Sequence, residues 1–474
     1  MRFAAPTPRA IPIYFVTKET WERAAAELPA AALAYARALD FEPKPGRLLA
    51  LPEPSGRLAA ALFGLEGADA PRDLLLPGKL ATALPPGVYR FANAPHDESL
   101  AALSFLLGAY RFTRYRRAGG PQPSLVAPAG VDAPRIEAIA EAIAFGRDLI
   151  NTPANDLGPT ELEREAVRLA HDFDAKVEVI RGADLLKRNF PLIHAVGRAA
   201  GEAPRLVDFR HGRSAAPKVT LIGKGVTFDT GGLDIKPASA MELMKKDMGG
   251  AAVALALARM IVAEGLDVRL RALIPIVENS ISATAFRPGD ILRSRKGLTV
   301  EIGNTDAEGR LILADALALA DEEAPALMFD FATLTGAARV ALGPDLPPFY
   351  TDDEALALDI CRFSLATADP LWRMPLWQAY DSMLEGKISD LNNAPSSSFA
   401  GSITSALFLK RFVVKTKSWA HFDVYAWSPK PRPQGPEGGE IQAARALFAL
   451  LEARYGDGKG KGRSRRRAAG KRRR

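Results

Sequence analysis

Apolar and polar residues follow two different patterns along the 474-residue chain, and the change falls near residue 130. In the first part, short apolar runs such as 11–16 and 48–51 are separated by Pro and Gly, and residues 21–39 place apolar positions at helical spacing. The segment 118–134 is rich in Gly, Pro and Ala, a composition typical of a boundary between domains. We therefore predict a small N-terminal α/β domain over residues 1–130, with no recognisable catalytic motif.

A predicted helix at 135–150 leads into a region, from residue 151 onward, in which strand patterns alternate with helical patterns. The predicted strands lie at 218–222, 268–277, 298–302, 327–333 and 418–425, and the predicted helices at 135–150, 244–263 and 306–321. Such alternation predicts a mostly parallel central sheet covered by helices on both faces. Catalytic residues of these folds lie in loops at the carboxyl ends of the strands. We predict a larger C-terminal catalytic domain of this kind over residues 131–455, which makes the fold class α/β.

The composition is that of a soluble globular protein, with 48% hydrophobic and 25% charged residues. The longest apolar stretch, at 249–260, is interrupted by Arg259, so no segment is predicted to span a bilayer. The amino end carries charge and proline where a secretory signal needs a continuous apolar run. These features predict a cytoplasmic protein.

Cysteine and histidine contribute little to the candidate chemistry. The single cysteine, Cys361, excludes an internal disulfide and a thiolate metal cluster. Its helical spacing from Leu358 and Leu365 indicates a packed, structural residue. The five histidines do not stand at metal-ligand spacing on a helix, and His421 lies in an apolar strand pattern that favours a packed histidine. Any metal site must therefore consist mainly of oxygen ligands.

The net charge of +7 comes from the end of the chain. Residues 456–474 hold ten Lys or Arg and one Asp, a net +9, so the rest of the chain carries −2. This tail has almost no apolar residues, and we predict that it is disordered. A disordered basic tail binds any polyanion without sequence specificity. An additional role in nonspecific nucleic-acid binding or regulation therefore stays open as an alternative function.

Three segments combine charged residues with glycines in a pattern that indicates chemistry. The first, 223–237, follows a predicted strand and holds Lys224, Asp229 and Lys236 in a glycine-rich loop. Glycines allow the backbone to approach a ligand closely. The chain has no Gly-x-x-x-x-Gly-Lys pattern, so this is not a phosphate loop. Taken alone, the segment is also compatible with a solvated connection.

The other two segments place carboxylates at the starts of predicted helices. Asp247, within 244–250, falls in a first helical turn, where the helix dipole favours an anion. The alternative is an ordinary helix-start aspartate. Asp306 and Glu308, within 304–311, are two residues apart, so in an extended segment both project to the same side. Here the alternative is a helix cap followed by a first-turn glutamate.

The four carboxylates of these segments become informative if they converge. Four negative charges about 5 Å apart form six repelling pairs, each costing roughly 3 kcal/mol at an effective dielectric constant of 20. The sum, on the order of 20 kcal/mol, exceeds the stability of a whole domain, so such a cluster must take up protons or bind cations. Two divalent ions would balance the charge, and oxygen ligands suit Mn²⁺, Mg²⁺ and Zn²⁺.

These segments resemble those of the leucyl aminopeptidase family, the cytosolic leucine aminopeptidases. Residues 304–311, Asn-Thr-Asp-Ala-Glu-Gly-Arg-Leu, match the signature octapeptide of that family. The resemblance continues through 226–232, 278–279, 287–290, 332–336, 389–391 and 419–423. It covers roughly residues 151–425, over half of the chain, whereas 428–440 departs from the family pattern.

The resemblance implies a centre of two divalent metal ions, Mn²⁺ or Zn²⁺, in each subunit. Asp229 and Glu308 would bridge the two ions. Asp306 would complete the ligand set of one ion, and Lys224 and Asp247 that of the other. A lysine binds a metal only as the neutral amine, so the ions must displace the proton of Lys224.

The implied reaction releases the first residue, leucine-like residues included, from a peptide with a free α-amine. A water bridging the ions would lose a proton and attack the peptide carbonyl. Lys236 would face the resulting oxyanion, and Arg310 would hold a bicarbonate that shuttles the proton. The residues implied for the side-chain pocket are Met244, Thr333, Leu334 and Gly336. For Met244 and Thr333, an ordinary core position is the alternative.

The resemblance also implies a homohexamer that acts on peptide substrates. A catalytically inactive protein of the same fold is disfavoured, because no ligand position of the family is substituted. A hydrolase based on His421 and Asp423 is disfavoured as well, because the chain has no Gly-x-Ser-x-Gly pattern.

Overall fold

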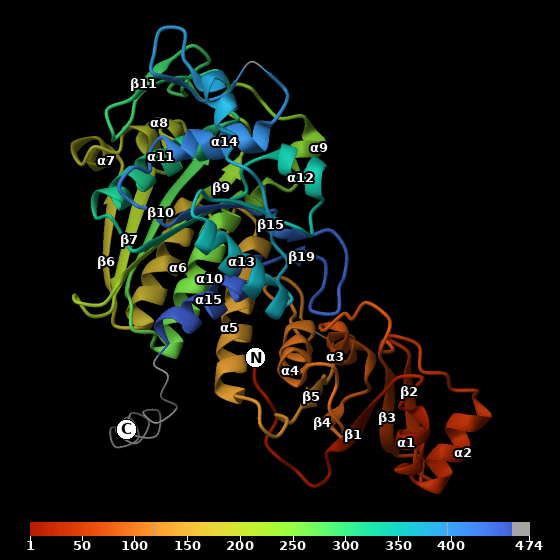
Figure 1. Cartoon of the computed structure of the whole chain (residues 1–474). Coiled ribbons are helices and arrows are strands. Elements are labelled where there is room, and N and C mark those ends of the chain that lie inside the picture. Colours follow the sequence, from red (N-terminus) through yellow and green to blue (C-terminus); the bar gives the residue numbers. More distant parts are fainter. Residues whose placement is uncertain (118, 396, 457–474) are drawn as a thin grey trace.

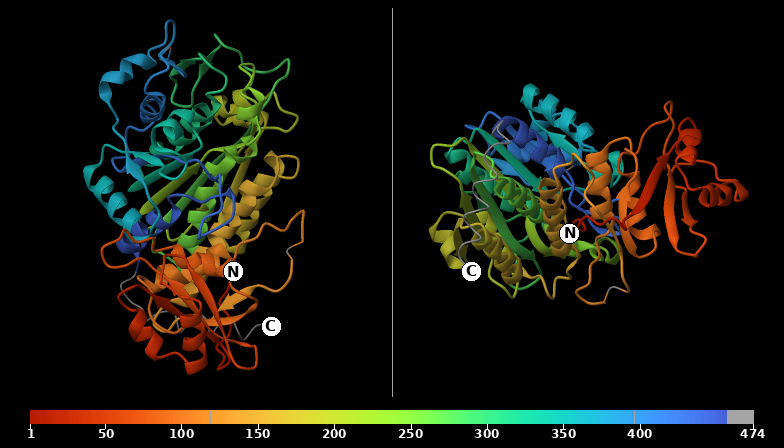
Figure 2. Two further views of the ribbon diagram at one scale, coloured as in Figure 1. Left: turned by 90° about the vertical axis from the view of Figure 1, so that its right-hand side faces the viewer. Right: turned by 90° about the horizontal axis from the view of Figure 1, so that it is seen from below.

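The computed structural model describes residues 1–117, 119–395 and 397–456. They form a small N-terminal domain around one sheet and a larger domain around a second, mostly parallel sheet with helices on both faces (Figures 1 and 2). The predicted α/β fold class is therefore confirmed. The predicted domain limits, 1–130 and 131–455, stay predictions. The basic residues of the tail, for which disorder is predicted, lie outside the described residues.

The N-terminal domain is built on five strands in the order β2-β3-β1-β4-β5. β1 runs parallel to β3 and β4, and β2 is antiparallel to β3. The single helix predicted for 21–39 is instead two helices, because Pro29 stands between them with an extended backbone. The elements are β1 (Ile11–Val16), α1 (Trp21–Ala26), α2 (Ala30–Ala38), β2 (Leu48–Pro52), β3 (Leu58–Gly64), η1 (Leu76–Lys79), α3 (Leu80–Ala83), β4 (Gly87–Phe91), α4 (Glu98–Gly108) and β5 (Pro123–Leu125).

The larger sheet has nine strands among the described residues, in the order β15-β14-β17-β13-β8-β10-β7-β6, with β9 paired to β10. The central neighbours from β17 to β10 are parallel, as predicted, whereas β6, β7 and β14 pair antiparallel with their inner neighbours. The strands are β6 (Lys176–Arg181), β7 (Arg205–His211), β8 (Lys218–Gly223), β9 (Gly225–Asp229), β10 (Arg269–Asn279), β13 (Leu327–Ala332), β14 (Pro348–Tyr350), β15 (Trp372–Arg373) and β17 (Trp419–Asp423).

Two smaller sheets lie outside this path. The strand predicted at 298–302 corresponds to β12 (Thr299–Glu301), which pairs with β11 (Ile291–Arg293) and β16 (Leu391–Asn392) rather than with the central sheet. The other small sheet consists of β18 (Trp427–Ser428) and β19 (Gly438–Gly439).

Both faces of the central sheet are buried, because successive residues of its strands face different hydrophobic clusters. In β10, Leu270 and Ala272 belong to one cluster, while Leu273 and Val277 belong to the other. Helices α5 (Ala133–Asn151), α6 (Pro159–Asp172), α10 (Gly249–Glu264), α13 (Glu354–Ala366) and α15 (Ala444–Tyr455) contribute to the first cluster. Helices α8 (Pro191–Gly197), α11 (Glu308–Glu322) and α14 (Gly401–Lys410), with η3 (Gln378–Leu384), contribute to the second. The short elements are α7 (Ala183–Lys187), α9 (Ala238–Met241), η2 (Met244–Met248) and α12 (Gly336–Leu342).

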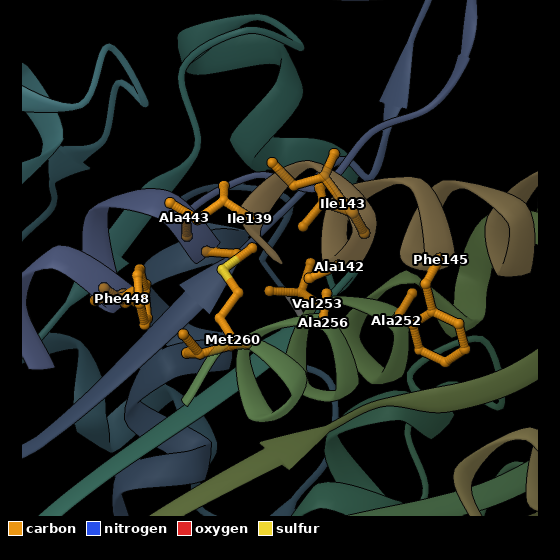
Figure 3. Close-up of a cluster of buried hydrophobic side chains, with 14 of the residues drawn as sticks. Ile139, Ala142, Ile143, Phe145, Ala252, Val253, Ala256, Met260, Ala443 and Phe448 are labelled. Atoms are coloured by element: carbon orange, nitrogen blue, oxygen red, sulfur yellow. The ribbon is translucent and has the colours of Figure 1, made fainter. Parts of the chain in front are cut away.

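Side chains of α5, α10 and α15 meet in the first cluster (Figure 3). Ala142 of α5 and Ala252 and Ala256 of α10 are fully buried, and small residues at a helix contact permit a close approach. Larger side chains, Met260 and Phe448 among them, fill the space toward α15. Among the described helices, none is long and apolar enough to cross a membrane.

The core also shows the surroundings of His421 and Cys361, both predicted to be packed, structural residues. His421, in β17, is fully buried, and its Nδ1 lies 2.6 Å from Oδ1 of Asp330, so the prediction of a packed histidine is confirmed. Cys361, in α13, is half-buried against the core. The expectation that it shares a packed face with Leu358 and Leu365 is wrong, because these leucines are 71% and 77% exposed.

Loops at the carboxyl ends of the parallel strands carry the candidate chemistry, as predicted for such a fold. Lys224 follows β8, Asp229 is the last residue of β9, and Thr333 follows β13. The helix predicted at 244–263 begins instead with the 3₁₀ turn η2, and α10 starts only at residue 249. Asp247 therefore lies in η2 and not in the first turn of the long helix.

The first turn of α10 lies directly against the sheet at Gly250. A Cβ at this position would come within 2.1 Å of the carbonyl oxygen of Phe331 and 2.9 Å of the amide nitrogen of Lys224. Backbone atoms cannot yield as a flexible side chain can, so Gly250→Ala is expected to lower stability by about 1–3 kcal/mol. The midpoint of thermal unfolding, followed by circular dichroism, measures this effect.

The matched control is Gly201→Ala, because a Cβ at Gly201 would meet no atom within 4 Å. We expect it to change stability by less than about 0.5 kcal/mol. Equal midpoints for the two variants would contradict the close packing of α10 on the sheet.

Candidate metal centre and active site

Three carboxylates from separate parts of the chain gather at the carboxyl edge of the central sheet. Ligand oxygens of Asp229, Asp306 and Glu308 all lie within 4.8 Å of one another. Asp229 ends β9, Asp306 lies in the turn before α11, and Glu308 is the first residue of α11. Asp229 and Glu308 are almost completely buried, so water screens their charges poorly.

The local geometry of 304–308 differs from the expectation. The segment is a turn and not an extended strand: the side-chain oxygen of Asn304 accepts a hydrogen bond from the amide of Asp306 at 2.7 Å. Asp306 and Glu308 point to one place because this turn leads directly into α11. The prediction that Asp306 and Glu308 lie close together is therefore right, but its basis, an extended segment, is wrong.

Lys224 joins Asp247 to this cluster. Its Nζ lies 2.7 Å from Oδ2 of Asp247 and 2.8 Å from Oε1 of Glu308, and it donates a hydrogen bond to the carbonyl oxygen of Thr333 at 3.2 Å. Both Lys224 and Asp247 are 3% exposed. Asp247 is distant in sequence from the other acids, but in the structure the same ammonium group, that of Lys224, contacts both Asp247 and Glu308.

Lys236 closes the other side of the cluster. Its Nζ lies 2.9 Å from Oδ2 of Asp229 and forms an ion pair with Asp306. The Lys236 side chain is 12% exposed, against 3% for that of Lys224. Lys236 is therefore the more accessible of the two ammonium groups.

Burial and mutual repulsion oppose the charged forms of the acids. The pKa of Glu308 is raised well above its ordinary value by burial and by the charge of Asp229. The same two causes raise the pKa of Asp306 to about 6. Burial alone would lower the pKa of the Lys224 ammonium, but Asp247, Glu308 and Asp229 together raise it. Lys224 and Lys236 therefore oppose the negative charge of the cluster, and protonation is favoured most at Glu308.

The oxygen atoms of the cluster suit a hard or borderline cation. Neither carboxylate oxygen of Glu308 accepts a hydrogen bond within the described part of the chain, although Lys224 lies at ion-pair distance. Oδ2 of Asp247 likewise accepts no hydrogen bond within these residues, although the Lys224 ammonium lies 2.7 Å away. Buried oxygens without donors are costly, and a divalent cation would satisfy them. The residues present therefore fit a metal centre.

Arg310 lies on α11, one half-turn beyond Glu308. Its Nη1 donates to the carbonyl oxygen of Asn393 at 2.5 Å and its Nη2 to the hydroxyl of Ser405 at 2.6 Å, while the buried Nε has no partner among the described residues. Burial lowers the pKa of Arg310 to about 10, so the guanidinium stays charged at neutral pH. The site therefore holds a fixed cation with one unsatisfied donor.

The four predicted pocket residues line the loops beside Asp247. Thr333 is buried, and its hydroxyl donates to Oδ1 of Asp247 at 2.7 Å. Met244 and Leu334 are half-buried, and the amide of Leu334 donates to Oδ1 of Asp423 at 3.0 Å. Gly336 is exposed, and a Cβ built on it would meet no atom within 4 Å. The wall at Gly336 is therefore open.

Sequence reasoning missed residues that orient the acids. Asn279, the last residue of β10, is fully buried and donates to Oδ1 of Asp229 at 2.8 Å and to the carbonyl oxygen of Thr305 at 3.1 Å. It fixes the carboxylate of Asp229 in one orientation. The only available signal was the position of Asn279 in the segment 278–279, which matches the leucyl aminopeptidases. Lys246, buried beside Asp247, was also overlooked; burial lowers its pKa to about 8.

Two family models match the chain. Residues 144–448 match the cytosol aminopeptidase family, catalytic domain, and residues 11–128 match the M17 aminopeptidase, N-terminal domain. A probable cytosol aminopeptidase of Rhodococcus opacus is 41% identical over 378 residues, 75% of this chain and 74% of that protein. Another from Roseiflexus castenholzii is 40% identical over 366 residues, 73% of this chain and 74% of that protein.

Solved structures show the same fold. The cytosol aminopeptidase from Coxiella burnetii superposes with a TM-score of 0.91 and is 44% identical, covering 95% of this chain and 98% of its own. The bottromycin maturation enzyme BotP, in complex with Mn, has a TM-score of 0.84 and is 32% identical, covering 94% and 99% of the two chains.

Protonation of the carboxylates should compete with metal binding. Because the pKa of Asp306 is raised to about 6 and that of Glu308 well above its ordinary value, protons occupy these groups at low pH and a metal must displace them. We expect the affinity of the chelator-stripped protein for Mn²⁺, measured by isothermal titration calorimetry, to fall about tenfold per pH unit below pH 6 for each proton displaced. An affinity that stays constant from pH 7.5 to 5 would contradict a carboxylate site.

Proposed function

The chain belongs to the M17 cytosol aminopeptidase family, and we propose that it releases leucine-like and other first residues from peptides with a free α-amine by two-metal hydrolysis. Membership makes the protein a metallopeptidase of the aminopeptidase class. The observation that carries the finer proposal is the gathering of Asp229, Asp306 and Glu308 around two lysines, because such a set of oxygen ligands fits two-metal amide hydrolysis.

We propose that the centre holds two divalent ions, Mn²⁺ or Zn²⁺. Asp229, Asp306 and Glu308 would hold the ions together with Lys224 and Asp247. When bound, the ions would neutralise the acids, polarise the peptide carbonyl and lower the pKa of a bound water. The oxygens of Glu308, which accept no hydrogen bond within the described residues, and the Mn complex of BotP support this assignment.

Lys224 has to change its protonation state when the site is loaded. In the metal-free protein its ammonium pairs with Asp247 and Glu308. A lysine is a metal ligand only as the neutral amine, so loading the site releases its proton. Lys236, by contrast, stays protonated and pairs with Asp229 and Asp306 at the more open side of the cluster.

Lys236 and Arg310 are the proposed catalytic residues. The Lys236 ammonium would stabilise the oxyanion that develops on the peptide carbonyl. Arg310, fixed by Asn393 and Ser405, would hold a bicarbonate through its remaining donors, and the bicarbonate would supply a proton acceptor beside the metal centre. Both partners of the guanidinium, a carbonyl and a hydroxyl, are uncharged, so its positive charge remains available to bind an anion.

The substrate pocket is proposed at Met244, Thr333, Leu334 and Gly336. Thr333 orients the carboxylate of Asp247, beside which the free α-amine of the substrate would bind. A blocked amine would lose its charge and its approach to this carboxylate, which accounts for removal of first residues only. The open wall at Gly336 leaves room for a branched apolar side chain.

Assembly, location and a second role are also proposed. Large apolar side chains are exposed between Trp372 and Phe399, Ile388 and Phe399 each by 79%, as in subunit interfaces, and this supports a homohexamer. The relatives named cytosol aminopeptidases support a cytoplasmic location. The nucleic-acid role of the basic tail concerns residues outside the described ones and stays an alternative prediction.

The substrate end that is recognised can be tested with leucine p-nitroanilide and its N-acetylated form. We expect hydrolysis of the free-amine compound to require added Mn²⁺ and to stop with a chelator. The blocked compound should not be cleaved, because its amine cannot bind beside Asp247. Release of nitroaniline from the blocked form at a comparable rate would refute the exopeptidase assignment.

The proposed residue roles can be tested by Glu308→Gln and Lys236→Ala. Each removes one charge that a developing transition state or a metal needs, so kcat should fall about 10²-fold to 10³-fold. The matched control is Lys176→Ala, on the exposed edge strand β6, which should retain wild-type turnover. If either site variant loses less than roughly tenfold, about 1.4 kcal/mol of barrier, its role is misassigned.

A further inference from the structure

One buried cation beside the candidate site has no role in the proposed mechanism. Lys246 lies in η2, immediately before Asp247, and is only 6% exposed. Charged side chains are seldom buried this deeply without an opposite charge or a ligand. The surroundings of Lys246 therefore need an explanation.

The Lys246 ammonium has neither a hydrogen-bond acceptor nor an ion-pair partner within the described ranges. Its contact is with an aromatic face: Nζ lies 4.5 Å from the centroid of the Tyr425 ring. The neighbouring carboxylate of Asp247 is directed elsewhere, with Oδ2 toward Lys224 and Oδ1 toward Thr333. Lys224 and Lys236 are ion-paired and Arg310 donates two hydrogen bonds, so Lys246 differs from the other cations of the site.

Lys245, the preceding residue, shows what a structural lysine looks like here. Its Nζ donates to the carbonyl oxygen of Asn151 at 2.9 Å and lies 5.5 Å from the centroid of Trp427. The two lysines are adjacent in sequence and similar in their aromatic contact. Only Lys245 has its ammonium satisfied by the protein, which makes it a matched reference for Lys246.

The space around Lys246 adjoins the proposed substrate pocket. The Tyr425 ring also lies 5.7 Å from the guanidinium carbon of Arg339, on α12, and the first residue of this helix is Gly336 with its open wall. Ala426 and Thr333 meet around Gly249, where a Cβ would lie 2.2 Å and 3.3 Å from their side chains. Tyr425 and Lys246 are thus continuous with the loops that carry the pocket.

The nearby carboxylate of Asp423 does not pair with Lys246, because it is already paired with Arg339. It also accepts hydrogen bonds from the amides of residues 334–335. Arg339 and Asp423 therefore neutralise each other and hold the pocket loop in place. Lys246 thus has no ion pair of its own within the described ranges, because the nearby carboxylates of Asp247 and Asp423 are directed to other partners.

We infer that Lys246 receives the side-chain carboxylate of an acidic first residue, Glu or Asp, so that the enzyme prefers acidic first residues to their neutral isosteres. This inference rests on the proposed function, because it names the substrate class of the same pocket. A charge-assisted hydrogen bond between ammonium and carboxylate supplies the acceptor that the protein itself does not provide. Met244 and Tyr425 offer apolar contact to the methylene groups of such a side chain, and the same contacts admit leucine.

The decisive comparison uses glutamyl and glutaminyl p-nitroanilides, which have the same shape and differ in charge. With the full-length, Mn²⁺-loaded protein at pH 7, we expect kcat/KM to be at least tenfold higher for the glutamyl compound. Lys246→Met should bring this ratio to one or below, and Lys246→Arg should keep it well above one. The control Lys245→Met should leave the ratio at its wild-type value, because Lys245 binds the backbone of Asn151.

The outcomes separate this inference from the function on which it rests. Cleavage of leucyl and glutaminyl anilides with a wild-type Glu/Gln ratio of one or less would overturn the role of Lys246 and leave the aminopeptidase intact. A high ratio that persists in Lys246→Met would overturn it as well. If no free-amine anilide is cleaved, the proposed function itself fails. The wild-type ratio decides the matter even if Lys246→Met does not fold.

Discussion

The concentration of negative charge at the ends of β8, β9 and β13 is the constraint that the rest of the catalytic domain must satisfy. Asp229, Asp247, Asp306 and Glu308 would carry −4, and Lys224 and Lys236 reduce this to −2 in the metal-free protein. Protonation of Glu308, whose pKa is raised well above its ordinary value, removes part of the remainder, and that of Asp306 contributes only toward pH 6. Two dications with a neutral Lys224 would instead leave the centre at +1. The loaded site would therefore attract an anion, which suits both an oxyanion and a bicarbonate.

The sheet makes this arrangement possible because it fixes the acids before any ligand arrives. Strands β8, β9 and β10 place Lys224, Asp229 and Asn279 at one edge, and Asn279 holds the Asp229 carboxylate through a hydrogen bond. Helix α10 approaches the same edge so closely that only glycine fits at residue 250. Repelling charges can be kept together only by a frame of this kind, in which the neighbouring backbone cannot relax.

Local sequence patterns predicted what depends on local interactions. The alternation of strands and helices gave the α/β class and the central parallel strands, and the segment 304–311 drew attention to Asp306 and Glu308. These patterns did not predict features that depend on contacts between residues far apart in the sequence. The membership of β12 in a separate sheet depends on its pairing with β16, about 90 residues away, and the 3₁₀ turn before α10 is not visible in a continuous helical pattern. Asn279 was missed for the same reason, since its partners Asp229 and Thr305 lie 50 and 26 residues away.

The 3₁₀ geometry of η2 directs the side chains of three consecutive residues, 245–247, toward different partners. With three residues per turn, Lys245, Lys246 and Asp247 point in directions about 120° apart. Lys245 reaches the backbone of α5, Lys246 reaches the Tyr425 ring, and Asp247 reaches Lys224 and Thr333. In an α-helix these side chains would lie about 100° apart, and Met244 and Asp247 would no longer stand directly above one another. The turn therefore directs the side chains of residues 246 and 247 apart, toward the Tyr425 ring and toward Lys224, although the two charges still act on each other.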